Sequence, residues 1–500
     1  MIFTATRPWW RPQRFDVLFT LWLVFSAAVL IGIFALRLGE YLGMATGILL
    51  LFAIAVRWPI VTAVFLVAFT PIQRFVIMLL YHFSHSVVLT KGVELWKEAV
   101  LAALVSRVIY DLFFRPERSH AIRVMDILVL FFVGVAGIYV FYPGPLGVDL
   151  FTRLQGFRTD ATFMAAYWAG RGLHIHRRQL RWILMSIVPG AVIVGLVAIW
   201  QFVTPALANR IFDYLGYTDF NAFSGATGDT LVVRARDLPG AAQLPRASSL
   251  ALSDLALAFF QLLLVSMSAA LFSLSKSWLA RAAAGGFLAL MAATMVLTLT
   301  RSAIAAAIGA VIGIAIVAGK LFRYGLLVAL GGGAVAAILI SGYIKLSTIE
   351  SLTNFQDASS VQHDQQIAKS IQVIEQYPFG RGLGTAGVVA QTQLKGGESL
   401  TNESWYLQLG TEIGVIGMGA YLLVVVAVML VSLWYFWRLH DHWLRLLTLT
   451  VAGAAGAFLV SGNFLHAWEN TPVSMVFWLF AGLAMRACDL EAWDGYWEQP

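Results

Sequence analysis

Residues Gly414 to Trp434 read GVIGMGAYLLVVVAVMLVSLW, a run of 21 residues without a charge. About 20 consecutive apolar residues are enough for a helix to cross a bilayer, so this run predicts a transmembrane helix. It belongs to one of fourteen apolar runs along the chain. The fold class that they predict is all-α, a polytopic integral membrane protein with about 12–14 transmembrane helices. The runs cover residues 17–36, 40–56, 59–80, 93–114, 124–142, 159–173, 182–203, 247–274, 279–298, 301–318, 322–341, 403–434, 444–465 and 472–487.

The composition agrees with a membrane protein. Of the 500 residues, 59% are hydrophobic and 12% charged, whereas about a quarter of the residues in a soluble domain are charged. The net charge of +7 comes from basic residues scattered between apolar runs, which disfavours nucleic acid as a partner. Cys488 is the single cysteine, so no disulfide and no cysteine-ligated metal site is possible within the chain.

The distribution of Lys and Arg predicts the orientation, because these residues collect in cytoplasmic loops. With fourteen spans the basic groups fall on one face, which places both termini in the cytoplasm. The long loops at 204–246 and 342–402 then lie on the outer, periplasmic face of a single membrane domain, residues 1–500. The N-terminal run is interpreted as a retained first helix rather than a signal peptide. The basic groups are Arg7/Arg11/Arg14, Arg115/Arg118/Arg123, Arg177/Arg178/Arg181, Lys276/Arg281, Lys320/Arg323 and Arg438/Arg445.

The second outer loop contains two recognisable segments. Ile367, Ile371 and Ile374 recur at helical spacing before Pro378, which predicts an amphipathic helix at about 362–377. Residues 378–387 then read PFGRGLGTAG and contain a literal G-x-G-x-x-G. No βαβ unit surrounds it, so it is not a dinucleotide fingerprint. It is either a flexible turn or a backbone cradle for an anion.

Several arginines are expected at the outer face. Arg301 stands at the mouth of a helix that is otherwise made of small and apolar residues. Its guanidinium either snorkels to the headgroups or offers a fork of donors to a phosphate. Arg158, Arg246 and Arg381 also lie at or near this face.

Carboxylates mark the other candidate residues. Asn402 and Glu403 stand where an outer loop becomes a membrane helix. Asn402 could cap that helix and Glu403 could complement its dipole, or Glu403 could act as a general base for a sugar hydroxyl. Asp254 and Glu412 lie inside apolar helices and are either functional or buried partners of an arginine.

Two further features of the sequence concern a polar turn and possible metal ligands. An outward turn before the last span is interpreted mainly as loop polarity. No Asp-x-Asp pair occurs and the histidines are dispersed, so neither a metal nor another cofactor is expected. The residues of the outward turn are Asn463, His466, Glu469 and Asn470.

Three segments resemble the superfamily of O-antigen ligases and Wzy-type polysaccharide polymerases, membrane glycosyltransferases that use lipid-linked sugars. The helix start at 300–302 (TRS) resembles the family's arginine at that place, and 378–384 (PFGRGLG) resembles its turn after the amphipathic helix. Glu403-Ser404, nine residues, and Gly414-x-x-Gly417 resemble the ligases' pattern of His-Asn/Ser/Gln, nine residues, and Gly-x-x-Gly. The likeness covers roughly residues 246–430 and implies a GT-C-like membrane architecture with two large outer loops.

The sequence departs from the family at two positions. Glu403 replaces the histidine of the ligases, which favours a polymerase over a ligase that acts on lipid A-core. An arginine that family members often carry at the start of the loop helix is not evident. His363 lies nearby, and Arg381 could take over that role.

The resemblance implies a metal-independent, inverting glycosyl transfer in the bacterial inner membrane. The substrates would be an undecaprenyl-pyrophosphate-linked donor and acceptor, and the partners membrane lipid and a possible chain-length regulator and export machinery. Glu403, oriented by Asn402, would be the base. The pyrophosphate would bind Arg301, Arg246, Arg158 and Arg381, with possible support from Asp254, His363, Tyr406 and Glu412.

Two other functions remain open from the sequence. A ligase of the same superfamily would move a finished glycan to a terminal acceptor. A transporter or flippase of lipid-linked oligosaccharide would place charges near the bilayer midplane, often within inverted repeats. The conspicuous polar residues of this chain instead cluster at the predicted outer mouth, and no such repeat is evident.

Overall fold

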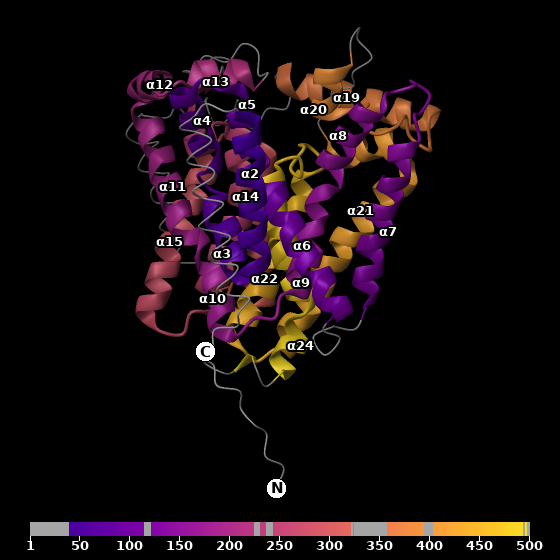
Figure 1. The fold of residues 1–500 in the computed structure, drawn as a ribbon. Coiled ribbons are helices and arrows are strands. Elements are labelled where there is room, and N and C mark those ends of the chain that lie inside the picture. Colours follow the sequence, from indigo (N-terminus) through magenta and orange to yellow (C-terminus); the bar gives the residue numbers. More distant parts are fainter. Residues whose placement is uncertain are drawn as a thin grey trace.

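The computed structural model describes residues 40–114, 122–224, 231–236, 244–321, 324, 358–394, 404–493 and 496–497. Helices dominate this part of the chain and form one bundle (Figure 1). The helices are α2 (Glu40–Arg57), α3 (Pro59–Phe69), α4 (Gln73–Ser84), α5 (Val87–Glu94), α6 (Trp96–Phe114), α7 (Val124–Phe141), α8 (Leu150–Asp160), η2 (Thr162–Met164), α9 (Ala165–Gly172), α10 (Arg177–Met185), α11 (Ile187–Val203), α12 (Pro205–Tyr214), α13 (Tyr217–Phe223), η3 (Ser249–Ala251), α14 (Asp254–Leu274), α15 (Trp278–Leu297), α16 (Arg301–Val317), α19 (Ala358–Gln376), α20 (Gly387–Gln393), α21 (Trp405–Arg438), α22 (His442–Ser461), α23 (Thr471–Met485) and α24 (Ala487–Ala492).

The predicted all-α, polytopic membrane fold is confirmed. Six helical stretches of the described residues are long and apolar enough to cross a bilayer, and the pair α2–α3, bent by 119°, would be a seventh. Two shorter apolar helices, α16 and α23, add to these. The predicted run 17–36 lies outside the described residues, as does 322–341 apart from Tyr324. The total of 12–14 spans therefore stays a prediction.

Two of the predicted runs are not single helices. Residues 59–80 are divided between α3 and α4 by a turn. Residues 159–173 are divided among the end of α8, the turn η2 and α9. Two charged residues of this stretch, Asp160 and Arg171, are buried, with 1% and 0% exposure.

The described part of the predicted first outer loop, residues 204–246, holds short elements. These are α12, α13 and a small antiparallel ribbon. The ribbon pairs β1 (Arg234–Arg236) with β2 (Leu244–Arg246), and Arg234 lies opposite Arg246.

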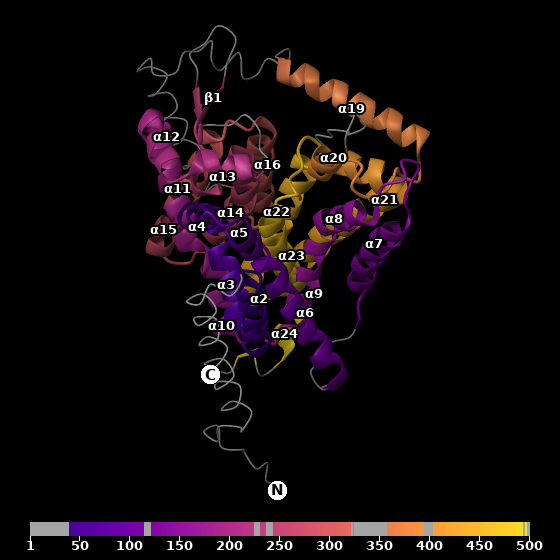
Figure 2. The ribbon, with the colours of Figure 1, turned by 45° about the horizontal axis from the view of Figure 1, so that its top comes forward.

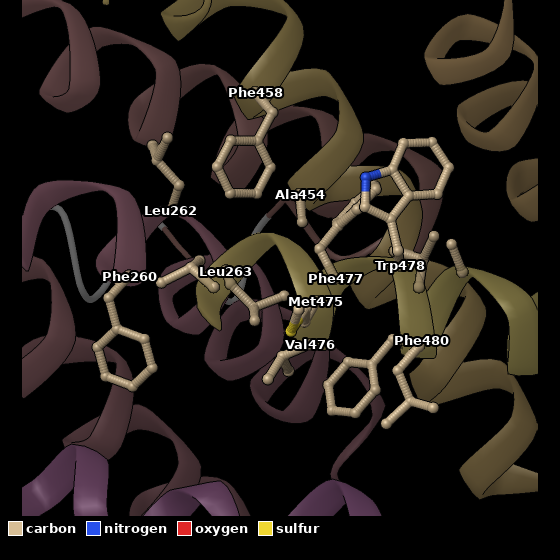
Figure 3. Packing of buried hydrophobic residues seen from close by; sticks show 14 of the residues in the cluster. Phe260, Leu262, Leu263, Ala454, Phe458, Met475, Val476, Phe477, Trp478 and Phe480 are labelled. Atoms are coloured by element: carbon tan, nitrogen blue, oxygen red, sulfur yellow. The ribbon is translucent and has the colours of Figure 1, made fainter. Parts of the chain in front are cut away.

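The core lies where α14, α22 and α23 meet. Side chains from all three helices interlock there (Figure 3). The rings of Phe458 and Phe477 lie 5.5 Å apart, and Trp468 packs on Phe477 at 5.0 Å. Because lipid tails are as apolar as these side chains, close packing rather than exclusion of water holds such helices together. The same rule explains why Gly170 of α9 and Gly482 of α23 face each other's backbones, where a Cβ would come within 2.2 Å and 2.1 Å of a carbonyl oxygen.

A buried ion pair joins α7 to α9. Asp126 receives two hydrogen bonds of 2.9 Å from Arg171, and neither side chain is exposed. The Tyr167 hydroxyl donates a third bond of 2.6 Å to Asp126. A charged side chain inside a membrane domain needs such a partner, since an unpaired charge is costly there.

Two of the basic residues predicted to share one face, Arg123 and Arg177, make ion pairs in the described part of the chain. Arg123 contacts Asp489 of α24, and Arg177 donates to Asp441 at 2.6 Å. Figure 1 places α24 at one end of the bundle and α12, α13, α19 and α20 at the other. The assignment of the end with α24 to the cytoplasm stays a prediction.

A long surface helix covers part of the opposite end. The helix α19 spans the range predicted to be amphipathic and lies across the ends of other helices (Figure 2). Its Ile374 packs where Gly410 of α21 lacks a side chain, since a Cβ there would come within 2.7 Å of Ile374 Cδ1. The Gly-rich segment follows directly, so α19 sets the path by which this segment enters the bundle.

Candidate functional site

The Gly-rich turn, residues 378–387, packs against a break in α21. Gly414 leaves the helical conformation there, with φ 72° and ψ −178°. A break frees backbone groups that must find other partners. The turn supplies them: Arg381 N–H donates to Thr411 O at 2.8 Å, Gly382 N–H donates to Glu412 O at 2.9 Å, and Val415 N–H donates to Pro378 O at 3.0 Å.

Two glycines make this contact possible. A Cβ on Gly380 would lie 2.4 Å from Glu412 O, and one on Gly414 would lie 2.5 Å from Pro378 O. Both residues also have positive φ, at 83° and 72°, a region that L side chains seldom adopt. The Gly-rich sequence is thus required for close packing of backbone on backbone.

The turn also binds a carboxyl group, that of the protein's own Glu412. Its Oε1 accepts a hydrogen bond from Ala386 N–H at 2.8 Å, and the carboxyl also accepts from Gly384 N–H. Of the two sequence interpretations, the backbone cradle therefore describes the segment better than a flexible turn. Glu412 is 1% exposed and its position is fixed by these bonds.

Three more polar side chains complete a buried cluster with Glu412, here called the carboxyl cluster: Asp160, Gln408 and Glu469. The carboxyl groups of Asp160 and Glu412 lie close enough to interact with each other. Gln408 Nε2 donates to Glu469 Oε1 at 2.9 Å and lies 3.5 Å from Asp160 Oδ1.

The sequence indicated only part of this cluster. Glu412 was a candidate, and Glu469 was assigned mainly to loop polarity. Gln408 precedes Glu412 by four residues, a spacing that places both on one helix face and could have revealed it. Asp160 comes from α8, 248 residues before Gln408, and nothing local in the sequence connects the two.

The start of α21 is held to the turn that follows α22. Ser404 caps the helix, since its Oγ accepts from Leu407 N–H at 3.4 Å, and Trp405 N–H donates to Gly462 O at 2.9 Å. The cap is therefore Ser404 rather than the expected Asn402, because the helix begins at Trp405. Asn402 and Glu403 lie outside the described residues. They directly precede this fixed helix start in the sequence.

Arg246 and Arg301 adjoin one short turn. Arg301 is the first residue of α16, as the helix start predicted from the sequence requires. Arg246 donates to Thr298 O at 3.1 Å and to Thr300 Oγ1 at 3.4 Å, immediately before Arg301. Its Nη2 also lies 2.5 Å from Asp254 Oδ2. Asp254 is thus the partner of an arginine, one of the two roles considered for it.

The remaining candidates are held by other elements. Arg158 of α8 donates to Glu98 Oε1 of α6 at 2.8 Å and 2.5 Å. Arg381 lies in the Gly-rich turn and is 9% exposed. Tyr406 is buried and donates to Phe458 O at 3.2 Å. The side chain of His363 lies outside the described part of α19.

No metal centre is evident in the described ranges. Among those residues, no group of three or more His, Cys, Asp or Glu side chains is arranged to hold a metal ion. This result includes the carboxyl groups of the carboxyl cluster, which are not arranged to hold a metal ion.

The class of protein is now defined: an all-α, multi-pass membrane protein with arginines and a Gly-rich turn at one end of its bundle. Residues 286–422 match the family model described as O-antigen ligase. This segment carries Arg301, the Gly-rich turn and the start of α21. The resemblance predicted from the sequence is confirmed for residues 286–422, which are similar to this family's domain.

The match also indicates a general class of function. It supports a membrane glycosyl-transfer function of the ligase or polymerase type, with lipid-linked glycans as substrates. No curated protein matches the chain.

Proposed function

We propose that the protein is a polysaccharide polymerase that joins undecaprenyl-pyrophosphate-linked oligosaccharide repeat units of an exopolysaccharide, capsule or O-antigen. The match of residues 286–422 to the O-antigen ligase family carries this proposal. The reaction takes place at the periplasmic face of the bacterial inner membrane, and both termini are cytoplasmic. A chain-length regulator and export machinery are its expected partners.

The chemistry is an inverting, metal-independent glycosyl transfer. A hydroxyl oxygen of the incoming lipid-linked repeat forms a bond to the anomeric carbon of the growing glycan. The bond from that carbon to the pyrophosphate oxygen breaks, and the undecaprenyl pyrophosphate leaves with the electron pair. Glu403, oriented by Asn402, accepts the proton of the attacking hydroxyl.

Arg301 and Arg246 neutralise the leaving pyrophosphate. Both adjoin the start of α16, where the helix dipole adds positive potential. Their attraction strengthens as negative charge develops, so it lowers the barrier. Asp254 holds Arg246 in place through its ion pair. Further contributions are expected from Arg158, Arg381, His363, Tyr406 and Glu412.

A ligase is the second candidate, because the matched family is described by that activity. In this version the same arginines bind the donor, and the acceptor is a terminal molecule such as lipid A-core. Glu403 stands where the ligases have histidine, and this substitution favours the polymerase.

An assay with purified protein and lipid-linked repeat units separates the candidates. Longer glycan on undecaprenyl pyrophosphate supports the polymerase, and transfer only to an added lipid A-core acceptor supports the ligase. Translocation without formation of a glycosidic bond would exclude both enzymes.

The catalytic assignment is tested by Glu403→Gln and Arg301→Ala. We expect Arg301→Ala to lower the turnover rate by about 10²–10³, by analogy with the loss of one oxyanion donor, and Glu403→Gln to abolish most product. Arg281→Ala is the matched control, since Arg281 lies in the first turn of α15 at the opposite end. Full glycan output from either site variant would disprove the assignment.

A further inference from the structure

A second group of cations lies outside the family segment, where α4, α6 and α8 meet. The Trp96 indole N–H donates to Gln73 Oε1 at 3.0 Å, which fixes the first residue of α6 beside the first residue of α4. Lys97 follows Trp96 and Arg74 follows Gln73 in the sequence. The two cations are thereby brought to the same junction.

Arg158 joins the group from α8. Its bonds of 2.8 Å and 2.5 Å to Glu98 bring α8 next to the residue that follows Lys97. The Lys97 ammonium is within electrostatic range of Arg74, Arg158, Glu94 and Glu98. These five residues form the junction cluster, with three cations and two carboxylates.

The cations of the junction cluster are unequally matched. Arg158 is hydrogen-bonded to the carboxylate of Glu98. Within the described residues, neither Arg74 nor Lys97 makes a hydrogen bond or an ion pair closer than 4 Å. Both side chains are partly buried among helices. A charge in such a place is costly and usually has a functional partner.

The position of the cluster argues against a role in orientation. Basic residues that sort a membrane protein collect on the cytoplasmic side, here the predicted end with α24. Figure 1 shows α4, α5 and α8 in the other half of the bundle, towards α19 and α20. The helices α4, α5 and α8, which carry three of the five cluster residues, lie in the half where lipid-linked substrates would meet the proposed site.

We propose that Arg74, Lys97 and Arg158 bind the pyrophosphate of the second lipid-linked substrate. A polymerase handles two such lipids at once, and the turn with Arg246 and Arg301 serves only one of them. An ammonium and guanidinium forks suit phosphate oxygens, and the net charge of the cluster leaves room for an anion. The inference rests on the proposed function for the identity of the ligand, although the site itself does not.

Binding of sugar-free undecaprenyl pyrophosphate tests the proposal without catalysis. We would place the full chain in phosphatidylcholine nanodiscs and count bound lipid by native mass spectrometry. The wild type should bind two molecules. Lys97→Met and Arg74→Gln should each weaken one of them by about ten- to a hundredfold, as expected for loss of a charged hydrogen bond.

Matched variants separate binding from folding. Lys97→Arg keeps the charge and should retain the second molecule. Lys91→Gln removes an exposed cation of α5 that lies over the Phe223 ring, and it should leave both molecules bound. Two molecules on a folded Lys97→Met variant, or a single molecule on the wild type that only Arg301→Ala removes, would overturn the inference.

Two further results have defined meanings. If the wild type makes no glycan, but the Lys97→Met variant binds one lipid fewer than the wild type, the junction site is supported and the proposed reaction is not. If phosphatidylglycerol displaces that molecule at equal concentration, the site binds phospholipid headgroups, and its assignment to a substrate is overturned.

Discussion

Replacing Glu412 by alanine removes the acceptor that holds the Gly-rich turn. The carboxyl accepts Ala386 N–H at 2.8 Å and Gly384 N–H, and it is 1% exposed. A buried donor left without a partner costs about 1–3 kcal/mol. The two N–H groups together therefore predict a loss of about 2–6 kcal/mol in the free energy of unfolding. That loss is a large part of the roughly 5–15 kcal/mol that stabilises a typical protein.

Unfolding in mixed micelles with increasing dodecyl sulfate measures this loss. Tryptophan fluorescence suits the purpose, because Trp405 is fully buried at the start of the same helix. Glu412→Gln should cost less, under about 2 kcal/mol, since the amide oxygen can still accept and its NH₂ can donate to Asp160. The matched control is Glu375→Ala on the exposed face of α19.

The order of the variants decides whether the reasoning holds. The expected stability order is wild type and Glu375→Ala, then Glu412→Gln, then Glu412→Ala. If Glu412→Ala unfolds within about 0.5 kcal/mol of the wild type, the carboxyl does not hold the turn. If alanine and glutamine cost the same, the backbone hydrogen bonds are not the cause.

Two further substitutions test other contacts. Gly380→Ala should cost at least about 2 kcal/mol, because its Cβ would lie 2.4 Å from Glu412 O at a positive φ. The control Gly419→Ala, whose Cβ would have no atom within 4 Å, should be neutral in the same unfolding assay. Equal effects of the two variants would contradict the argument. Asp126→Ala should cost about 3–5 kcal/mol, because it removes the carboxylate that accepts two 2.9 Å hydrogen bonds from the buried Arg171 guanidinium. A second change to Arg171→Met, which removes the buried charge, should restore part of this loss, and no recovery would argue against that charge as the cause.

The candidate site was only partly predictable, and particular residues show why. Arg301 was found because a charge at the start of an apolar helix is a local signal. Asp254 and Glu412 looked alike in the sequence, as acids within apolar helices. Their surroundings differ: Asp254 pairs with Arg246, whereas Glu412 accepts hydrogen bonds from backbone N–H groups and lies near Asp160. The sequence contains no local sign of that difference.

The sequence by itself determined that this protein lies in lipid and that its apolar runs form helices. An apolar run such as Ile416 to Trp434 is expected to be helical in lipid, because each of its backbone groups needs a partner and neighbours along the chain can supply one. The same reasoning holds for α14, α15 and α16, whose observed starts lie within a few residues of the charged or polar residues before each run.

The tertiary structure decided where helices break and what the polar residues inside them bind. The break at Gly414 is occupied by the turn that begins at Pro378, and the Asp160 carboxyl reaches Gln408 across 248 residues of chain. The same holds for Arg74 and Lys97, whose helices are joined by the hydrogen bond from Trp96 to Gln73. Such contacts join segments that are distant in sequence, and their free energy depends on packing that no local pattern records.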